Sequence, residues 1–469
     1  MKVGDKINVD IVRLGDNAEG IGKIDEKVVF VTYAPNNSNC EIRIDKISKN
    51  YINATLIKVN SSKMELLTPL CANFTKCGGC DTWYYSYEYE LEYKRKKVED
   101  VIKKFAGTSV RALPVIYGKD TLYRNKIELF TKCVDGRVRL GQFKKESHEF
   151  VAIDRCLLCD KWLDQVIEIF NGWVNLCGLK AYDEQTNKGL LKGIVVRYLG
   201  GKLVLTVVVN GDGIREIDSL SKKIGEKFDS YSVYICKNKK KGSRLLTKDL
   251  VKVYDDEKLI LVDNVKCSVS PLSFFQVNDE VRAKLYNEVV KEVKEGEIII
   301  DAYSGVGLLT NQLSKKASDV FGVEIVKDAV KDADNLAALN GNYGKITNIC
   351  GDSALILPKL VSAITTGDKE KLKELVVNNS SKKDYKGLVT SGKEVAIVLD
   401  PPRKGADVSV LSAVNESGAK RVIYVSCNPI TLARDLKILA DTYKIVKVQP
   451  FDLFPKTSHV ETLCVLTRK

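Results

Sequence analysis

The chain has 469 residues and carries 74 Lys and Arg against 61 Asp and Glu, a formal net charge of +13. Hydrophobic residues make up 44% and charged residues 29%, which is ordinary for a globular protein and excludes wholesale disorder and fibrous repeats. The length predicts two to four domains. The basic excess points to a polyanion, with nucleic acid first and an acidic membrane surface second, although a Lys-rich composition alone also gives basic enzymes.

The first ten residues, MKVGDKINVD, lack the apolar stretch of a secretory signal. No window reaches the roughly 18 apolar residues that a membrane span requires. We therefore expect a cytoplasmic protein without a membrane partner. Disulfides are disfavoured in that compartment, so the thirteen cysteines are expected to be metal ligands, nucleophiles or buried apolar residues.

Residues 1–60 consist of short runs in which apolar and polar residues alternate, separated by glycine-containing turns. This pattern predicts a small antiparallel barrel of about five strands. Nine Lys and Arg stand against eight Asp and Glu in this region. A nucleic-acid-binding role for the barrel therefore does not follow from its charge.

The middle region, residues 61–270, is expected to form one domain that mixes helices and strands. It opens with a cysteine-bearing loop and an aromatic run, and the apolar positions of the next segment predict a helix over 88–105. Further apolar runs predict strands at 124–131, 193–198, 202–210 and 231–236 and a helix at 163–176.

The last region, residues 271–469, alternates strand-length apolar runs with helical patterns such as 326–339. Buried parallel strands have this composition, so the order predicts an α/β fold with a doubly wound sheet. The segments 444–451 and 461–467 predict an antiparallel hairpin at the sheet edge. Residues 361–393 are polar and Lys-rich and predict an insertion or a mobile loop. The expected parallel strands cover 297–303, 320–325, 345–350, 395–399 and 421–426.

The segment Asp301-Ala-Tyr-Ser-Gly-Val-Gly307 lies where a predicted strand turns into a helix, and its glycines let the backbone approach a ligand. Such a turn alone is weak evidence. However, Glu324 ends the next strand 23 residues after Asp301, where a carboxylate accepts hydrogen bonds from ribose hydroxyls. No third glycine follows, and the acidic Asp301 suits a cationic sulfonium better than a phosphate. We therefore expect S-adenosylmethionine as the cofactor.

Two further motifs lie at the carboxyl ends of predicted strands, the edge at which open α/β sheets bind ligands. The rigid turn Asp-Pro-Pro-Arg-Lys-Gly at 400–405 presents Asp400 to the cleft. Cys427 lies in Ser-Cys-Asn-Pro; a cysteine there is usually a core residue, but this one faces the same cleft and can act as a nucleophile. Near the terminal hairpin, Glu461 is either a surface carboxylate or a proton acceptor, and His459 is expected to be structural.

The spacing Cys71-x5-Cys77-Gly-Gly-Cys80 is typical of a metal centre, because the two glycines allow a sharp turn between converging thiolates. This loop supplies three ligands, and Cys156 and Cys159 are both candidates for the fourth. Zinc and an iron–sulfur cluster each accept four thiolates, so the spacing leaves both open. Radical S-adenosylmethionine chemistry requires x3 and x2 spacing and is disfavoured.

Basic residues concentrate in two stretches of the middle region. Residues 119–145 carry eight Lys and Arg against three acidic residues, with Tyr123, Phe130 and Phe143 among them, and residues 237–252 carry seven against one. Phosphate contacts combined with aromatic stacking are typical of proteins that bind single-stranded RNA. A solvated charged surface is the alternative for the second stretch.

Together, these motifs resemble those of the bacterial RNA uracil-C5-methyltransferases, specifically the 23S ribosomal RNA branch with an N-terminal TRAM domain. The resemblance spans essentially the whole chain and includes Ser273-Phe-Phe-Gln-Val-Asn278 and the His-Val-Glu-Thr run at 459–462. It implies an RNA-binding TRAM (OB-like) barrel over 1–60, a mixed α+β central domain with an iron–sulfur cluster over 61–270, and a Rossmann-like SAM-dependent methyltransferase domain over 271–469.

The resemblance also implies roles for individual residues. Cys427 would add to C6 of uracil, because C5 alone is too weak a nucleophile to attack a methyl sulfonium, and Glu461 would remove the C5 proton. Many relatives have an asparagine where this chain has Leu308, so one polar contact to the cofactor is absent or replaced. The implied ligands are Gln276, Tyr303, Glu324, Asp352 and Asp400 for S-adenosylmethionine and Cys71, Cys77, Cys80 and Cys159 for a [4Fe-4S] cluster.

We therefore expect a monomeric enzyme that forms 5-methyluridine in 23S ribosomal RNA. Two alternatives stay open: the same reaction on transfer RNA, and a noncatalytic RNA-binding factor in ribosome assembly with a structural metal. The N-terminal barrel favours ribosomal RNA, because transfer-RNA members of the family typically lack it. The presence of Cys427, Asp400 and Glu461 favours catalysis, and zinc is the second choice of metal.

Overall fold

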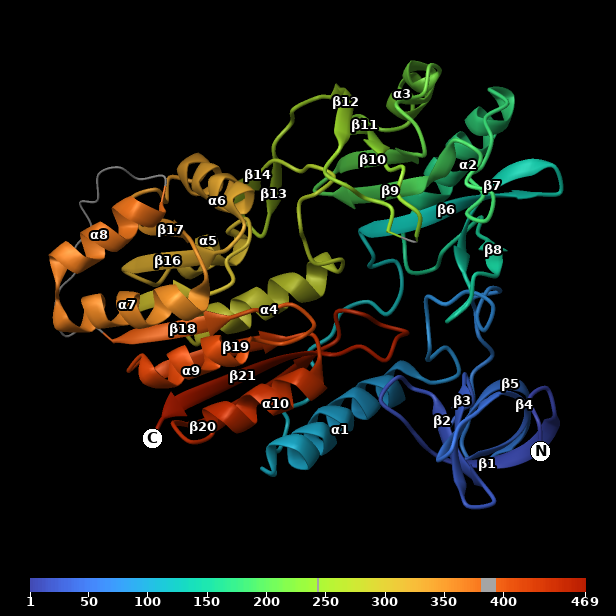
Figure 1. Ribbon diagram of the computed structural model, residues 1–469, viewed down its shortest axis with the longest axis horizontal. Coiled ribbons are helices and arrows are strands. Elements are labelled where there is room, and N and C mark those ends of the chain that lie inside the picture. Colours follow the sequence, from blue (N-terminus) through green and yellow to red (C-terminus); the bar gives the residue numbers. More distant parts are fainter. Residues whose placement is uncertain (243, 381–393) are drawn as a thin grey trace.

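The computed structural model describes residues 1–242, 244–380 and 394–469. Figure 1 shows an N-terminal barrel, a middle sheet with helices, and a C-terminal sheet with helices on both faces. A long helix lies between the barrel and the C-terminal sheet. No helix within the described ranges is long and apolar enough to cross a membrane.

The N-terminal barrel is present as expected, with five strands closed in the order β1-β2-β3-β5-β4. All neighbouring strands are antiparallel except β3 and β5, which are parallel. Alternate apolar side chains fill the interior, and Ile42, Ile44 and Ile52 are fully buried. The strands are β1 (Lys6–Leu14), β2 (Gly20–Ile24), β3 (Lys27–Thr32), β4 (Ser38–Ile47) and β5 (Tyr51–Ser62).

The middle sheet has seven strands in the order β12-β11-β10-β9-β6-β7-β8, and it shares one hydrophobic core with two helices. The aromatic side chains of Phe170 and Trp173 lie at the centre of this core. All four strands that the sequence predicts here are present. The elements are β6 (Lys126–Val134), β7 (Arg137–Phe143), β8 (Phe150–Ala152), α2 (Lys161–Leu176), β9 (Leu191–Leu199), β10 (Lys202–Val209), α3 (Ile217–Gly225), β11 (Tyr231–Lys237) and β12 (Leu250–Asp255).

The C-terminal sheet has the predicted doubly wound architecture, with strand order β17-β16-β15-β18-β19-β21-β20. Its first five strands are parallel, and β21 pairs antiparallel with both β19 and β20. A separate hydrophobic core lies on each face of this sheet. The strands are β15 (Ile298–Asp301), β16 (Asp319–Glu324), β17 (Ile346–Cys350), β18 (Val395–Leu399), β19 (Arg421–Ser426), β20 (Tyr443–Phe451) and β21 (Glu461–Arg468).

Helices cover both faces of the C-terminal sheet (Figure 1). One face carries α4, α5 and α6 together with the short hairpin of β13 and β14, and the other carries α7, α8, α9 and α10. The bounds are β13 (Ile260–Val262), β14 (Val265–Cys267), α4 (Asp279–Lys291), α5 (Leu308–Leu313), α6 (Lys327–Leu339), α7 (Ser353–Thr366), α8 (Lys369–Asn379), α9 (Val408–Glu416) and α10 (Pro429–Leu439).

Helix α1 (Tyr87–Ala106) has the predicted bounds to within one residue, but it packs on the C-terminal sheet rather than on the middle one. The Ser86 hydroxyl caps its first turn by accepting from the Tyr89 amide. Its apolar stripe, which includes Val98 and Ile102, lies against α10 in the shared core. The stripe predicts a buried helix face without specifying which element covers it.

The segment that follows α1 covers the edge of the C-terminal sheet. The Leu113 and Ile116 amides donate to the carbonyls of Val448 and Pro450, each at 2.9 Å, and the Asp452 amide donates to the Ile116 carbonyl at 2.9 Å. An uncovered edge strand exposes a row of unpaired backbone groups. This segment therefore pairs part of strand β20 that would otherwise be open.

The expectation of a polar insertion or a mobile loop over 361–393 is wrong in its second alternative for the first half of the segment, which is helical. Helix α7 continues to Thr366, and α8 follows almost at once. The side chains of Leu372 and Val376, four residues apart, are fully buried in the core of the C-terminal sheet. This apolar pair holds α8 in place despite its polar composition. Residues 381–393 lie outside the described residues.

Candidate active site and cysteine cavity

The acidic residues expected to bind the cofactor end three neighbouring parallel strands. Asp301 is the last residue of β15, Glu324 is the last of β16, and Asp400 follows β18 directly. Because β15 pairs with β16 on one side and β18 on the other, the three carboxyl ends meet at one edge of the sheet. The sheet therefore gathers these three carboxyl groups in one place.

The turn after β15 is shaped by Gly307, whose φ of +86° lies in the left-handed region. A Cβ atom there would also approach the Ala333 Cβ to 3.1 Å. The Glu324 carboxylate holds this turn, because its oxygens accept from the Gly305 amide at 3.1 Å and the Val326 amide at 2.8 Å. Leu308 is buried in the core beneath the turn.

Asp301 and Asp400 are carboxyl groups in an unfavourable environment. The Asp301 Oδ2 atom accepts from the Thr310 hydroxyl at 2.7 Å, whereas its buried Oδ1 atom has no partner among the described residues. Burial raises the pKa of Asp301 to about 6. Burial, and then the charge of Asp301, raise the pKa of Asp400 to about 7. A cation bound between them would relieve both penalties.

The other predicted cofactor ligands have different surroundings. Gln276 is buried in the loop before α4, where its backbone carbonyl accepts from the Asn125 side chain at 3.0 Å. Tyr303 is half-buried, and burial raises the pKa of its phenol to about 12. The exposed Asp352 caps α7 by accepting from the Ala354 amide at 2.9 Å. Asp352 therefore has a structural role in addition to any contact with a ligand.

The candidate nucleophile and base lie next to these carboxyl groups. Cys427 follows β19 and Glu461 begins β21, and the pairing of Ser426 with Thr462 makes them neighbours. Glu461 is 1% exposed, and its Oε2 atom has no hydrogen-bond partner among the described residues. Burial, and then the charge of Asp400, raise the pKa of Glu461 well above its usual range. Burial, and then the charge of Glu461, raise the pKa of Cys427 to about 12.

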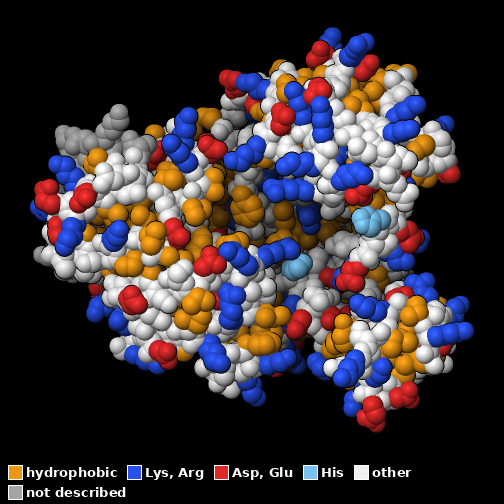
Figure 2. Space-filling model, in the orientation of Figure 1, with side chains coloured by type: hydrophobic (Ala, Val, Ile, Leu, Met, Phe, Trp, Pro, Cys, Tyr) orange, Lys and Arg blue, Asp and Glu red, His pale blue; other side chains and the backbone are white. Residues whose placement is uncertain are grey.

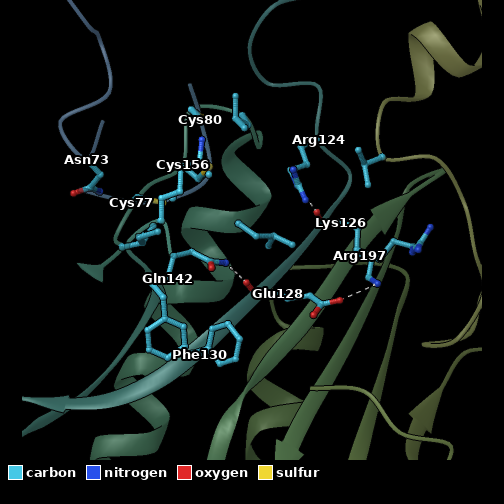
Figure 3. Close-up of a pocket in the computed structure, with 18 of the residues that line it drawn as sticks. Asn73, Cys77, Cys80, Arg124, Lys126, Glu128, Phe130, Gln142, Cys156 and Arg197 are labelled. Carbon is cyan, nitrogen blue, oxygen red and sulfur yellow. Dashed lines mark hydrogen bonds and ion pairs between the residues drawn. The ribbon is translucent and has the colours of Figure 1, made fainter. Parts of the chain in front are cut away.

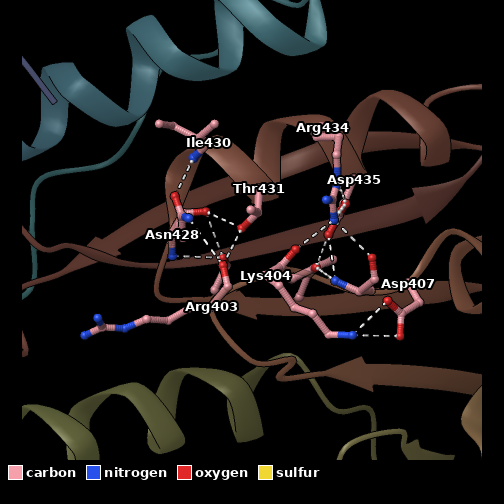
Figure 4. A network of polar contacts seen from close by, with 11 residues as sticks. Arg403, Lys404, Asp407, Asn428, Ile430, Thr431, Arg434 and Asp435 are labelled. Atoms are coloured by element: carbon pink, nitrogen blue, oxygen red, sulfur yellow. Dashed lines mark hydrogen bonds and ion pairs between the residues drawn. The ribbon is translucent and has the colours of Figure 1, made fainter. Parts of the chain in front are cut away.

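Figure 4 shows how α10 fixes the turn at 400–405. The buried Asp435 carboxylate accepts from the Tyr424 hydroxyl at 2.6 Å and the Ala406 amide at 2.9 Å. Arg434 donates to the carbonyls of Lys404 and Ala406, each at 3.1 Å. These bonds hold the turn while the Arg403 side chain extends away from the network (Figure 4).

The cysteine loop borders a cavity of about 850 Å³ on the middle sheet. Figure 3 shows the side chains of Cys77, Cys80 and Cys156 gathered at one end of this cavity, and Cys71 also lines it. Cys159 is only 2% exposed and belongs to the hydrophobic core of the middle sheet. Cys156 lines the cavity with the three loop cysteines, and the predicted Cys159 lies beside it without lining the cavity.

The thiols in this cavity are electrostatically coupled. Burial raises the pKa of Cys77 to about 11 and that of Cys80 further still. A hydrogen bond from the Cys159 thiol lowers the pKa of Cys156 to about 6. Across the described ranges, no three His, Cys, Asp or Glu side chains stand in a ready metal-binding arrangement.

The two basic stretches of the middle region converge on the same cavity, although 119–145 and 237–252 are far apart in sequence. Arg124, Lys126 and Lys145 line it from the first stretch and Arg244 from the second. The aromatic rings of Phe130 and Phe143 are also part of its wall. Figure 2 shows Lys and Arg side chains around the hollow at the centre of the molecule.

A second groove, of about 1060 Å³, extends from the barrel to Arg403, whose charge acts on Cys427. It is lined by Phe30 and Arg43 of the barrel, by Lys145, and by Arg403 and His459 near the candidate nucleophile. His459, expected to be structural, therefore borders a groove. Basic and aromatic side chains thus line a groove that joins the barrel to the turn at Arg403.

Comparison with known proteins decides the family. The profile of the tRNA (uracil-5-)-methyltransferase family matches residues 86–469, and that of the TRAM domain matches residues 1–57. The chain belongs to the tRNA (uracil-5-)-methyltransferase family. It is thus a SAM-dependent RNA uracil-C5-methyltransferase with an N-terminal TRAM domain.

Relatives of this methyltransferase span its whole length. An uncharacterized RNA methyltransferase from Clostridium tetani is 33% identical over 475 residues, covering 100% of this chain and 97% of the relative. One from Caldanaerobacter subterraneus is 33% identical over 476 residues, covering 100% and 99%. The crystal structure of Pyrococcus abyssi tRNA (uracil-54, C5)-methyltransferase with S-adenosyl-L-homocysteine has a TM-score of 0.73 at 23% identity, covering 98% of this chain and all of that one. This last likeness shows a shared fold.

Two features of the methyltransferase site were missed by the sequence reasoning. Ile325 and Leu355 are 67% and 66% exposed, and they follow Glu324 and Asp352 in the chain. Large exposed apolar side chains beside a ligand-binding edge favour an apolar ring as their partner. For Ile325 the signal was available in the sequence, because this apolar residue directly follows the acidic residue that ends a strand.

Proposed function

We propose that the protein forms 5-methyluridine in 23S ribosomal RNA, with S-adenosylmethionine as methyl donor and Cys427 as covalent nucleophile. One observation carries the proposed chemistry: a thiol and a buried carboxyl group with an oxygen that has no partner among the described residues lie side by side, next to Asp400. A general base such as Glu461 removes a proton from the substrate, and a thiol nucleophile such as Cys427 activates the substrate by adding to it. The presence of the two groups side by side supports a reaction that includes both steps.

The proposed chemistry assigns one step to each residue. The Cys427 thiolate adds to C6 of uracil, and the displaced electron pair makes C5 nucleophilic as part of an enolate. S-adenosylmethionine, when bound, supplies the electrophilic methyl group that C5 takes up. The Glu461 carboxylate then removes the C5 proton, and the electron pair restores the C5–C6 double bond and expels the Cys427 sulfur.

The three carboxyl groups at the strand ends suit S-adenosylmethionine. The Asp301 Oδ1 atom has no partner among the described residues, and the pKa of Asp400 is raised. A positive charge bound between the two carboxyl groups would therefore stabilise their ionised forms. The Glu324 oxygens accept one amide each and retain lone pairs for ribose hydroxyls. Gln276, Tyr303 and Asp352 complete the proposed binding set, with Ile325 and Leu355 added beside the adenine.

This assignment predicts a pH-dependent difference between two ligands. Since the pKa values of Asp301 and Asp400 are raised to about 6 and about 7, the folded protein retains protons that the unfolded chain releases above about pH 4. The apo protein therefore loses stability as pH rises from about 4 to 7. Sulfonium binding offsets this loss, whereas the neutral thioether of S-adenosylhomocysteine does not.

We expect the increase in melting temperature with S-adenosylmethionine, relative to that with S-adenosylhomocysteine, to grow between pH 5 and pH 8. Thermal unfolding at saturating ligand measures it. The Asp301→Asn variant serves as the control, because it should flatten the pH dependence. Equal shifts by both ligands at every pH would contradict the electrostatic role.

Four cysteines, Cys71, Cys77, Cys80 and Cys156, are proposed to hold a [4Fe-4S] cluster. They provide four sulfur donors around one cavity, the number that such a cluster requires, and the charge of Arg124 favours the thiolate forms of Cys77 and Cys156. Zinc would use the same donors and is the second candidate.

The cluster assignment makes a prediction that separates the two candidate fourth ligands. Protein purified under anaerobic conditions should be brown, absorb light at about 400 nm, and contain iron and sulfide. Cys156→Ala should lose this absorbance, whereas the matched Cys159→Ala variant should keep it. Zinc in place of iron would contradict the cluster, and the reverse pattern of the variants would reinstate Cys159.

Ribosomal RNA is proposed as the substrate because of the resemblance to the ribosomal RNA branch of the family, which carries an N-terminal barrel. The Pyrococcus abyssi structure, however, is of a tRNA (uracil-54, C5)-methyltransferase and resembles this chain over 98% of its length, so transfer RNA is the second candidate. The basic and aromatic cavity and groove suit either RNA.

The substrate is decided by mapping 5-methyluridine in ribosomal and transfer RNA from a strain that lacks the gene. Loss from 23S ribosomal RNA, restored by the gene, is the expected result. Loss from transfer RNA alone would select the second candidate. Loss from neither, together with failure of the protein to bind S-adenosylmethionine, would favour a noncatalytic RNA-binding factor.

A further inference from the structure

The loop of residues 452–458, which leads into the strand that begins with Glu461, is held by parts of the chain remote in sequence. The Tyr123 hydroxyl donates to the Pro455 carbonyl at 3.0 Å, and the Asp81 amide donates to the Lys456 carbonyl at 2.8 Å. Most of this loop is buried. Its conformation therefore depends on helix α1, the cysteine loop and the middle region rather than on the C-terminal sheet alone.

The peptide groups of Ser458 are bound by two charged side chains. Its amide donates to Asp81 Oδ2 at 3.0 Å, and its carbonyl accepts from the Lys97 ammonium at 2.8 Å. Only two residues separate Ser458 from Glu461, and the Ser458 side chain is itself buried. A shift of Ser458 would therefore move the start of β21, where the proposed base stands.

Lys97 also contacts the barrel. Its ammonium donates at 2.5 Å to the carbonyl of Asp16, in the turn between β1 and β2, and one helical turn earlier the Tyr93 hydroxyl donates to the neighbouring Gly15 carbonyl at 2.7 Å. The same turn contributes Asn17 and Glu19 to the groove that extends to Arg403. One side chain thus joins a groove-lining turn of the barrel to the loop before Glu461.

A nearby lysine on the same helix has a different role. Lys94 is fully buried and forms ion pairs of 2.7 Å with both Glu90 and Asp452, so its loss would leave two buried carboxylates without their partner. Lys97 is half-buried, and both of its bonds are to neutral backbone carbonyls. Its replacement breaks no ion pair among the described residues, because Asp81, the largely buried carboxylate near Lys97, is paired with Lys145. The effect on function is therefore separable from folding.

We propose that Lys97 is a positioning residue for Glu461. Through the Ser458 carbonyl it fixes the start of β21, so that the carboxylate faces the C5 proton, and through the Asp16 carbonyl it makes that position depend on the RNA-contacting barrel. The proposal rests on the proposed function, in which Glu461 acts after methyl transfer. Loosening this link therefore slows proton removal without slowing addition of Cys427.

The test uses Lys97→Met, which keeps the aliphatic stem and removes the ammonium, in the full-length protein with substrate RNA and S-adenosylmethionine. We expect kcat to fall by about 10- to 100-fold, the range for a small misplacement of a catalytic group, with KM for RNA and cofactor changed less than about twofold. The fraction of protein covalently bound to methylated RNA on denaturing gels should rise. A merely structural role would not produce this rise.

Three controls make the result specific. Lys96→Met changes the adjacent residue, whose side chain is 64% exposed, and should behave as the unmodified protein does. Lys97→Arg can still donate to both carbonyls and should restore part of the turnover. In a Glu461→Gln background, Lys97→Met should add no further slowing, because the group it positions is gone.

The possible outcomes separate this proposal from the proposed function. If the unmodified protein methylates RNA and Glu461→Gln traps the adduct, but Lys97→Met turns over normally or loses addition and methyl transfer without trapping RNA, the positioning role alone is overturned. If the unmodified protein makes no 5-methyluridine in any RNA, both proposals fall. Thermal unfolding of the variants identifies any loss that arises from misfolding.

Discussion

Replacing Glu461 by glutamine is expected to leave RNA covalently attached to the protein after the methyl group has been transferred. Glutamine has the shape of glutamate and cannot accept the C5 proton, so the sulfur of Cys427 stays bonded to C6. Turnover should fall by about 10²- to 10⁴-fold, the usual contribution of a general base. A slower-migrating protein–RNA band on denaturing gels, carrying the labelled methyl group, measures this outcome.

The burial of Glu461 explains why the variant should still fold. The carboxyl group has an oxygen without a hydrogen-bond partner among the described residues, and burial raises its pKa well above its usual range. An uncharged amide in its place removes the cost of ionising a buried group. Glu416→Gln changes an exposed glutamate on α9 and should have no effect. If the Glu461→Gln protein is active and traps no RNA, another residue must be the base.

The same carboxyl group predicts how activity depends on pH. A raised pKa means that Glu461 is still protonated at pH values where an exposed glutamate has ionised. Because only the ionised form accepts the C5 proton, the rate of that step should rise as pH rises through this elevated pKa. Single-turnover measurement of adduct decay across pH tests the sign, and decay that slows with rising pH would contradict it.

Replacing Cys427 by alanine is expected to abolish both methylation and the covalent adduct. Without the sulfur, nothing adds to C6, and C5 remains too weak a nucleophile to take up the methyl group. Binding of S-adenosylmethionine should be unchanged within about twofold, since the cofactor is assigned to Asp301, Glu324 and Asp400. Methyl transfer to RNA and calorimetric titration with the cofactor measure the two expectations separately.

Cys133→Ala, at an exposed cysteine on β6, serves as the matched control and should retain activity. Burial, and then the charge of Glu461, raise the pKa of Cys427 to about 12, so the thiol is neutral at pH 7 in the free protein. The adduct should therefore form faster as pH increases. In the Cys427→Ala, Glu461→Gln double variant no adduct should form, and any methylation that persists in Cys427→Ala would contradict the covalent route.

Much of the fold follows from local patterns in the sequence. The strands β18 and β19 have the predicted bounds to the residue, because short runs of four or five consecutive apolar residues between polar ones have few other arrangements in an α/β chain. The position of α1 could not be predicted, since an amphipathic stripe requires a buried partner but does not name it. The same applies to α8, whose two core residues are too few to outweigh its charged composition.

The candidate site likewise contains residues that the sequence predicts and residues that it does not. Asp301, Glu324, Asp400 and Cys427 follow from a general property of parallel sheets, namely that strands deliver their carboxyl-terminal residues to one edge. The choice between Cys156 and Cys159 depends on which way each thiol points in a short turn before α2, and spacing does not contain that information. The contacts of Lys97 join residues that are distant in the chain, so no local pattern indicates them.

The ion pair between Lys94 and Asp452 joins residues 358 positions apart. At a synthesis rate of about 5–20 residues per second, α1 waits roughly 20–70 s for its partner to be made. During translation, the apolar stripe of α1 and the Lys94 ammonium are therefore exposed until the C-terminal sheet and Asp452 have been made. The final assembly of the catalytic unit must follow the synthesis of β20 and β21, because these strands and α1 stabilise one another.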